Sequence, residues 1–187
     1  MPRAIALLFF GCLFLILPAG AAAETSTGGA QYSEPAPIVA PGAKAKLLPD
    51  GSAAAPADAP PAVKAAIFAA NKLLDKPYKY GGGHAKVEDS GYDCSGTVSY
   101  ALIAAGVLKS PLDSGSFMRW GLKGRGAWIT VYTNPGHAYA VIAGLRLDTS
   151  TGGVTSRRIA RTAERGPRWR AALRTSRGFR ARHPLGL

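Results

Sequence analysis

The residues of this chain that could form a nucleophile and its base are cysteine and histidine. There are two cysteines, Cys12 in an apolar N-terminal run and Cys94 in the segment YDCSG. A thiolate beside an imidazole can attack a carbonyl carbon. An unpaired cysteine can equally be a small, buried and unreactive side chain. The cysteine count alone leaves both interpretations of Cys94 open.

The first residues predict export. Arg3 is followed by apolar residues 4–17 and then by three alanines that end at Ala23. This layout is typical of a secretory signal peptide over residues 1–23. A retained membrane anchor is the alternative, but the apolar run of about 14 residues is shorter than the roughly 20 that a spanning helix needs. Cleavage would remove Cys12 and leave Cys94 as the only thiol.

The charge of the chain is strongly positive and uneven. The formal net charge is +12, and residues 151–187 hold ten arginines against one acid, Glu164. Such a block predicts attraction to polyanions, which for an exported protein means anionic cell-wall polymers or lipid head groups rather than nucleic acid. A solvated arginine-rich face is the alternative interpretation.

The chain divides by composition into a linker and one domain. Residues 24–60 are rich in alanine, proline and glycine and have almost no aromatic residues. Such a segment buries too little apolar surface to offset the entropy of ordering, so it predicts a disordered linker. Residues 61–187 remain for a single domain.

Two helices are predicted at the start of this domain. Residues 61–74 begin with a proline and place apolar side chains on one helical face. Residues 94 to about 107 predict a second helix, with Asp93 as its candidate N-cap. Cys94 would then lie in the first helical turn, where the helix dipole favours a thiolate and backbone N–H groups can hold an oxyanion.

The second half of the domain predicts an antiparallel sheet. After a possible short helix at residues 117–120, strands are expected over residues 128–132, 137–142, 145–148 and 178–182. Helices followed by an antiparallel meander indicate the α+β class.

This order of elements can bring a base and its orienting group to the thiol. His137 opens a strand directly after a Pro-Gly turn, and Asp148 ends the next strand of the hairpin. An antiparallel pair places a strand's start beside its partner's end, so Asp148 can fix the tautomer of His137. Cys94, His137 and Asp148 then form a nucleophile, a base and an orienter. Each has an alternative: a buried thiol, a solvated histidine and a turn-forming aspartate.

Three segments resemble the NlpC/P60 cysteine peptidases. These are PYKYGG at residues 77–82, GYDCSG at residues 91–96 and the later pair Gly136-His137. The resemblance covers most of residues 61–150. It implies a papain-like core and hydrolysis of peptidoglycan stem peptides, most often between D-γ-glutamate and the diamino acid.

The resemblance also implies roles for single residues. Cys94 is implied to be the nucleophile and His137 the general base, while Asp148 stands where the family usually has His, Asn or Gln. Tyr78 corresponds to the tyrosine whose hydroxyl approaches the cysteine. Asp93 and Ser95 are implied to hold the substrate, and the helix-cap role of Asp93 stays open beside this.

Two features depart from the family pattern. An acid usually enters the strand before the histidine strand, whereas this chain reads Gly126-Ala127-Trp128 there, and the arginine-rich end has no counterpart. These departures bear on substrate choice more than on reaction type. His84, a third histidine near the site, is expected to be solvated, with a place lining the cleft as the alternative.

The sequence therefore predicts a secreted or cell-envelope cysteine peptidase of bacterial type that hydrolyses peptidoglycan stem peptides. No organic cofactor is expected, and no metal, because one cysteine and scattered histidines lack a zinc-ligand spacing. The alternatives are an N-acetylmuramoyl-L-alanine amidase or an acyltransferase on the same fold, or a non-catalytic wall-binding protein.

Overall fold

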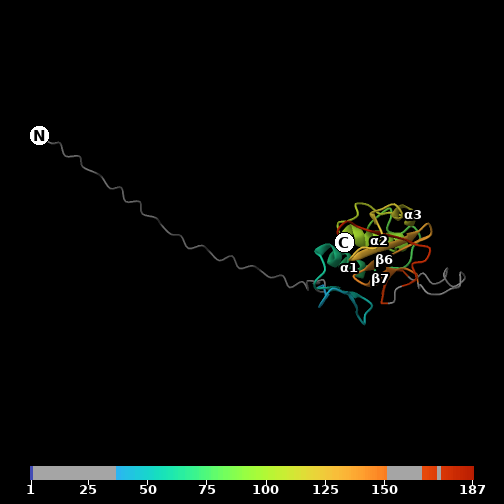
Figure 1. The fold of residues 1–187 in the computed structure, drawn as a ribbon, viewed down its shortest axis with the longest axis horizontal. Coiled ribbons are helices and arrows are strands. Elements are labelled where there is room, and N and C mark those ends of the chain that lie inside the picture. The colour runs from blue at the N-terminus through green and yellow to red at the C-terminus, as the bar shows by residue number, and fades with distance from the viewer. Residues whose placement is uncertain (2–36, 151–165, 172–173) are drawn as a thin grey trace, which may run out of the picture. The chain divides into compact units, whose positions relative to one another are not determined.

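The computed structural model describes Met1 and residues 37–150, 166–171 and 174–187 (Figure 1). The chain divides into two units, Met1–Glu34 and Pro35–Leu187, and the second contains every element below. The predicted signal peptide, the first part of the predicted linker and residues 151–165 of the arginine-rich end lie outside the described residues.

A six-stranded antiparallel sheet forms one layer of the fold. Its strands lie in the order β4-β9-β5-β6-β7-β8. Their bounds are β4 Leu122–Lys123, β5 Ile129–Asn134, β6 His137–Ile142, β7 Leu145–Asp148, β8 Arg168–Arg170 and β9 Arg180–His183. The predicted meander is confirmed in β5, β6 and β7, and the predicted last strand is present as β9. Its place between β4 and β5 was not predicted.

Helices pack on one face of this sheet. They are α1 Pro61–Asn71, α2 Cys94–Ala104 and α3 Ser114–Phe117. In Figure 1, α1 and α2 lie beside β6 and β7, and α2 contacts both strands. The alternation of β6 buries Ala138, Ala140 and Ile142 in the core under the helices. Helices on an antiparallel sheet confirm the predicted α+β class.

The helix ends differ slightly from the prediction. Helix α1 stops at Asn71 rather than residue 74, and α3 begins at Ser114 rather than residue 117. Asp113 causes the second difference, because its carboxylate accepts from the backbone N–H of Ser116 at 2.8 Å and caps α3.

Residues 37–60 correct the predicted disordered linker. They form a three-stranded sheet of β1 Val39–Ala40, β3 Ala53–Pro56 and β2 Lys46–Leu47, in that order. The three alanines of β3 are at most 1% exposed, and β3 packs against α1. Small side chains let this strand approach the helix closely, so burial comes from contact of backbone and methyl groups rather than from bulky side chains. The folded unit therefore begins before Pro61.

Asn71, the last residue of α1, joins three elements by its side chain. Its Oδ1 accepts from the backbone N–H of Ala53 at 2.9 Å and from the indole N–H of Trp169 at 2.8 Å. Its Nδ2 donates to the carbonyl oxygen of Ala53 at 2.9 Å. One amide thus ties β3 and β8 to the end of α1.

None of the helices in the described residues is both long and apolar enough to cross a membrane. The apolar run at residues 4–17 is not among those residues.

Candidate active site

Cys94 is the first residue of α2, as predicted, and its side chain is partly buried. The preceding Asp93 is the N-cap: its Oδ1 accepts from the backbone N–H of Gly96 at 2.7 Å. The N-cap role of Asp93 is therefore confirmed. The cap fixes the direction in which the first-turn N–H groups beside Cys94 point.

Glycines let the preceding loop lie against the start of α2. A Cβ on Gly96 would be 2.0 Å from the carbonyl oxygen of Gly82, and a Cβ on Gly82 would be 2.3 Å from that of Gly91. No other residue fits at such separations. The glycine run thus brings the backbone of the loop close to the start of this helix.

His137 and Asp148 lie together at the ends of neighbouring strands. The Nε2 atom of His137 is 2.9 Å from Oδ1 of Asp148, whose side chain is fully buried. An ionised carboxylate can only accept, so Nε2 carries the hydrogen. The neutral ring then has Nδ1 as its acceptor, which is the nitrogen needed to take a proton.

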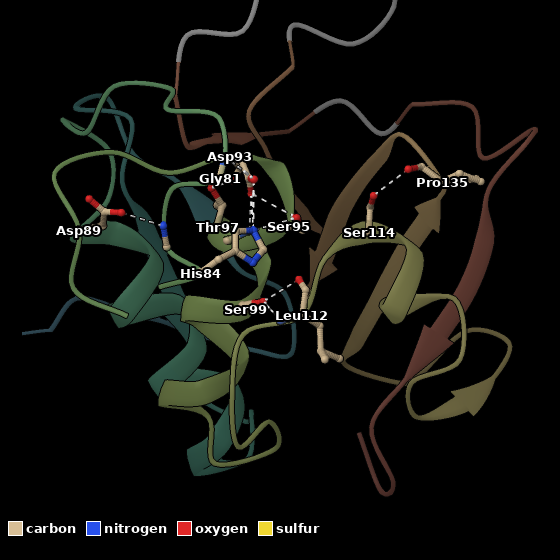
Figure 2. Close-up of polar contacts among 12 residues, drawn as sticks. Gly81, His84, Asp89, Asp93, Ser95, Thr97, Ser99, Leu112, Ser114 and Pro135 are labelled. Carbon is tan, nitrogen blue, oxygen red and sulfur yellow. Dashed lines mark hydrogen bonds and ion pairs between the residues drawn. The ribbon is translucent and has the colours of Figure 1, made fainter. Parts of the chain in front are cut away.

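Helix α3 holds the turn that precedes His137. Figure 2 shows Ser114 pointing at Pro135, and the Ser114 hydroxyl donates to the Pro135 carbonyl at 3.2 Å. The hydroxyl of Thr133 in β5 donates to the carbonyl oxygen of Ser114. The turn between β5 and β6 is thereby fixed from the helix side, and with it the first residue of β6.

The charge on His137 reflects two neighbours. Burial lowers the pKa of His137, but hydrogen bonds to Asp148 and to Cys94 outweigh it and raise the pKa from 6.5 to about 9. The ring of His137 thus contacts both Cys94 and Asp148. A histidine in contact with a cysteine side chain is the arrangement that activates a cysteine nucleophile.

Asp148 remains ionised despite its burial. Burial raises the pKa of this carboxyl, but the contact with His137, the backbone N–H of Ser150 and the charge of Arg174 together hold the pKa below its ordinary value. The guanidinium of Arg146 is a further positive charge, with its Nε atom 3.5 Å from Oδ2 of Asp148. A carboxylate with this many partners keeps its charge through the neutral range.

A second histidine, His84, contacts the two residues on either side of Cys94 in the sequence. In Figure 2, His84 points at Asp93 and Ser95. Its Nε2 lies 3.0 Å from Oδ1 of Asp93 and 3.2 Å from Oγ of Ser95. The expectation of a solvated His84 is wrong, because Asp93 supplies a buried acceptor across the loop.

The His84 cluster does not form a serine triad. Such a triad uses both ring nitrogens, one for the acid and one for the hydroxyl. Here Nε2 alone faces both Asp93 and Ser95, and the Ser95 hydroxyl also donates to Asp93 at 3.2 Å. The cluster instead closes around the Asp93 carboxylate.

The segment that holds Tyr78 runs beside the residues before Cys94. Tyr78 and Tyr92 form a parallel β-bridge, in which the N–H of Tyr92 donates to Pro77 at 3.1 Å and that of Lys79 donates to Tyr92 at 3.2 Å. Tyr78 is half-buried, whereas Tyr80 is exposed. The bridge therefore places the backbone of Tyr78 beside Tyr92, shortly before the start of α2.

Sequence reasoning missed the arginines of the site. Arg146 and Arg174 both approach Asp148, at 3.5 Å and 3.3 Å. Arg146 could have been found from the alternation of β7, which places it on the same side as Asp148. Arg174 comes from a segment with no recognisable spacing to the site. No group of three metal-ligating side chains occurs among the residues that the structure describes.

The fold is of the α+β class. In its candidate site, the ring of His137 contacts both Cys94 and Asp148. No model of a protein family and no curated protein matches the chain. Similar solved structures include the peptidoglycan hydrolase RipB of Mycobacterium tuberculosis, with 20% identity, a TM-score of 0.44, and coverage of 65% of this chain and 64% of that one.

Two further structures are similar. A hypothetical invasion protein of Mycobacterium tuberculosis, Rv1477, has 24% sequence identity and a TM-score of 0.45. A mutated form of the resuscitation promoting factor interacting protein RipA has 26% sequence identity and a TM-score of 0.45. Each covers 65% of this chain and 61% of its own, so this chain spans less than two thirds of all three. NlpC/P60, the family of these structures, is the family that the motifs resemble. All three TM-scores lie below 0.5.

Proposed function

We propose that the protein is a cysteine peptidase that hydrolyses amide bonds in peptidoglycan stem peptides. The observation that carries the proposal is the contact series at the start of α2: Asp148 bonds one nitrogen of His137, and the ring of His137 contacts Cys94. This series supplies a nucleophile, a base and a fixed tautomer.

The reaction follows from these contacts. Nδ1 of His137 takes the proton of Cys94, and the thiolate attacks the amide carbonyl. First-turn N–H groups of α2, such as that of Cys94, hold the oxyanion. The C–N bond breaks as the imidazolium of His137 gives its proton to the leaving amine. Water activated by His137 then releases the acyl group from the sulfur.

The proposed substrate is the bond between D-γ-glutamate and the diamino acid. It is supported by the motif PYKYGG and the pentapeptide that contains Cys94. Tyr78, Asp93 and Ser95 are proposed to contact the stem peptide on the α2 side. Asp93 already accepts from Gly81, His84 and Gly96, so it acts mainly through the loop that it holds.

The proposed location is outside the cytoplasm. The N-terminal layout of residues 1–23 supports secretion, and a net charge of +12 supports attraction to anionic wall polymers. Both fit a peptidoglycan substrate in the bacterial cell envelope.

The test is product analysis on defined muropeptides. Mass spectrometry should show new amino termini at the diamino acid with the wild-type protein and at least a thousandfold less product with Cys94→Ala or His137→Ala. Lys109→Ala, an exposed change, is the matched control and should retain the wild-type rate. Cleavage between muramic acid and L-alanine would identify an amidase instead. Product formation that survives Cys94→Ala would refute the thiol mechanism.

A further inference from the structure

The C-terminal segment reaches the His137–Asp148 pair from a different part of the chain. NH1 of Arg174 donates to Oδ2 of Asp148 at 3.3 Å and to Oγ of Ser150 at 2.9 Å. Phe179, five residues later, lies edge-on to the ring of His137 with 6.3 Å between centroids. This segment belongs to the arginine-rich end that has no counterpart in the motif pattern.

The two oxygens of Asp148 have different donors. Oδ1 accepts from Nε2 of His137 at 2.9 Å, from the N–H of Ser150 at 2.9 Å and from its hydroxyl at 3.0 Å. Oδ2 accepts from Arg174, while the nearby Nε of Arg146 has no hydrogen-bond partner. Within the described residues, Arg174 therefore donates the hydrogen bond that holds Oδ2.

Aromatic rings hold the Arg174 guanidinium in place. Its central carbon lies 5.3 Å from the ring centroid of Tyr139 and 5.1 Å from that of Phe179. The two rings pack edge to face at 5.2 Å. A planar cation between two rings has few orientations, so its N–H groups stay directed at Asp148 and Ser150.

We propose that Arg174 is a positioning residue, which holds the Asp148 carboxylate in the rotation that directs Oδ1 at His137. Its importance for hydrolysis rests on the proposed function. Within the part of the chain that the structure describes, the ionisable groups around His137 include Cys94 from α2, Tyr139 from β6 and Asp148 from β7, with Arg146 and Arg174 behind the carboxylate.

Replacing Arg174 would change the pKa of His137 in opposite directions under two possible roles of this arginine. If Arg174 acted only as a distant positive charge, its removal would favour the imidazolium and raise the pKa of His137. If it positions Asp148, its removal lets the carboxylate rotate and weakens the hydrogen bond that raises this pKa. The direction of the change therefore identifies the role.

The test is an NMR titration of the His137 ring in the full chain. We expect the midpoint to lie near pH 9 in the wild type and to fall by at least one unit, towards 6.5, in Arg174→Gln. Arg174→Lys keeps the charge without the planar fork and should give a smaller fall. Arg177→Gln, an exposed arginine three residues on, is the matched control and should leave the midpoint unchanged.

An unchanged or raised midpoint in Arg174→Gln would overturn the proposal. If that variant does not fold, Arg174→Lys decides, and a wild-type midpoint in folded Arg174→Lys would overturn it equally. The titration needs no substrate. Inactivity on muropeptides would therefore refute the proposed function without affecting this result.

Discussion

Two histidines lie near the start of α2, and their hydrogen bonds differ. His137 bonds Asp148 through Nε2 and leaves Nδ1 for another partner, whereas His84 uses Nε2 for both Asp93 and Ser95. Only the first arrangement separates the acid side of the ring from the nucleophile side. At the residue scale, this difference supports the proposal that His137 is the base, while His84 binds the Asp93 carboxylate across the loop.

The contribution of Asp148 can be measured from pH dependence. His137 must be protonated to give its proton to the leaving amine, so kcat/KM should fall as pH rises through about 9. Asp148→Asn keeps a carbonyl acceptor but removes the charge that raises this pKa. We expect the alkaline limb to move towards neutral pH and kcat/KM at pH 8 to fall at least about tenfold.

The measurement is kcat/KM on a muropeptide between pH 6 and pH 10. Lys109→Ala serves as control and should keep the wild-type limb. A limb that stays near pH 9 in Asp148→Asn would contradict the assigned role of this carboxylate.

At the element scale, the start of α2 depends on close contact with the glycine loop. Gly96→Ala would gain up to about 1 kcal/mol of helix propensity. Its Cβ would however lie 2.0 Å from the carbonyl oxygen of Gly82, and such overpacking costs about 1–3 kcal/mol or more. The clash outweighs the propensity, so a net loss of stability is expected.

Chemical denaturation measures this change. Gly136→Ala is the matched control, because its Cβ would meet only Oδ1 of Asn134, at 3.9 Å. Gly96→Ala as stable as Gly136→Ala would show that the loop can move away from α2.

The end of α1 offers a second element-scale prediction. Asn71→Ala removes the partners of the N–H and C=O of Ala53 and of the Trp169 indole. Unsatisfied buried polar groups cost about 1–3 kcal/mol each, so the free energy of unfolding should fall by about 3 kcal/mol or more. Asp75→Ala, an exposed change one turn on, should stay within about 0.5 kcal/mol of the wild type. Equal losses in both variants would contradict a linking role of Asn71.

Periodicity was enough to predict the elements that carry the site. The apolar face of α1, the hairpin at residues 129–142 and the strand that ends at Asp148 all follow local rules of pattern and turn. Strand β3 was not predicted, because its alanines resemble a linker in composition and become buried only through tertiary contact with α1. Local pattern also places β9 in the chain but cannot specify its neighbours in the sheet.

The candidate site was predictable to a similar extent. Cys94, His137 and Asp148 follow from a helix start and two strand ends. His84 and Arg174 could not be predicted, because each reaches the site through a loop whose path depends on tertiary packing.

At the scale of the whole molecule, the His137 pair couples folding to pH. The pKa of His137 rises from 6.5 to about 9 on folding. A raised pKa adds stability that is fully present below pH 6.5 and is lost as pH rises through about 9. The shift corresponds to at most about 3 kcal/mol.

The free energy of unfolding should therefore decline between pH 6.5 and pH 9, which urea denaturation at several pH values can measure. His137→Gln should flatten the decline over this range. His183→Gln is the control and should leave it unchanged. An equal decline in His137→Gln would assign the pH dependence to other groups.

The position of β9 affects how the sheet can be assembled during synthesis. Its residues 180–183 leave the ribosome after those of β5, yet β9 pairs with both β5 and β4. Until β9 arrives, one edge of β5 presents unpaired backbone N–H and C=O groups to other chains. A nascent chain that stalls before residue 180 would thus expose a site for intermolecular strand pairing, which the finished sheet covers.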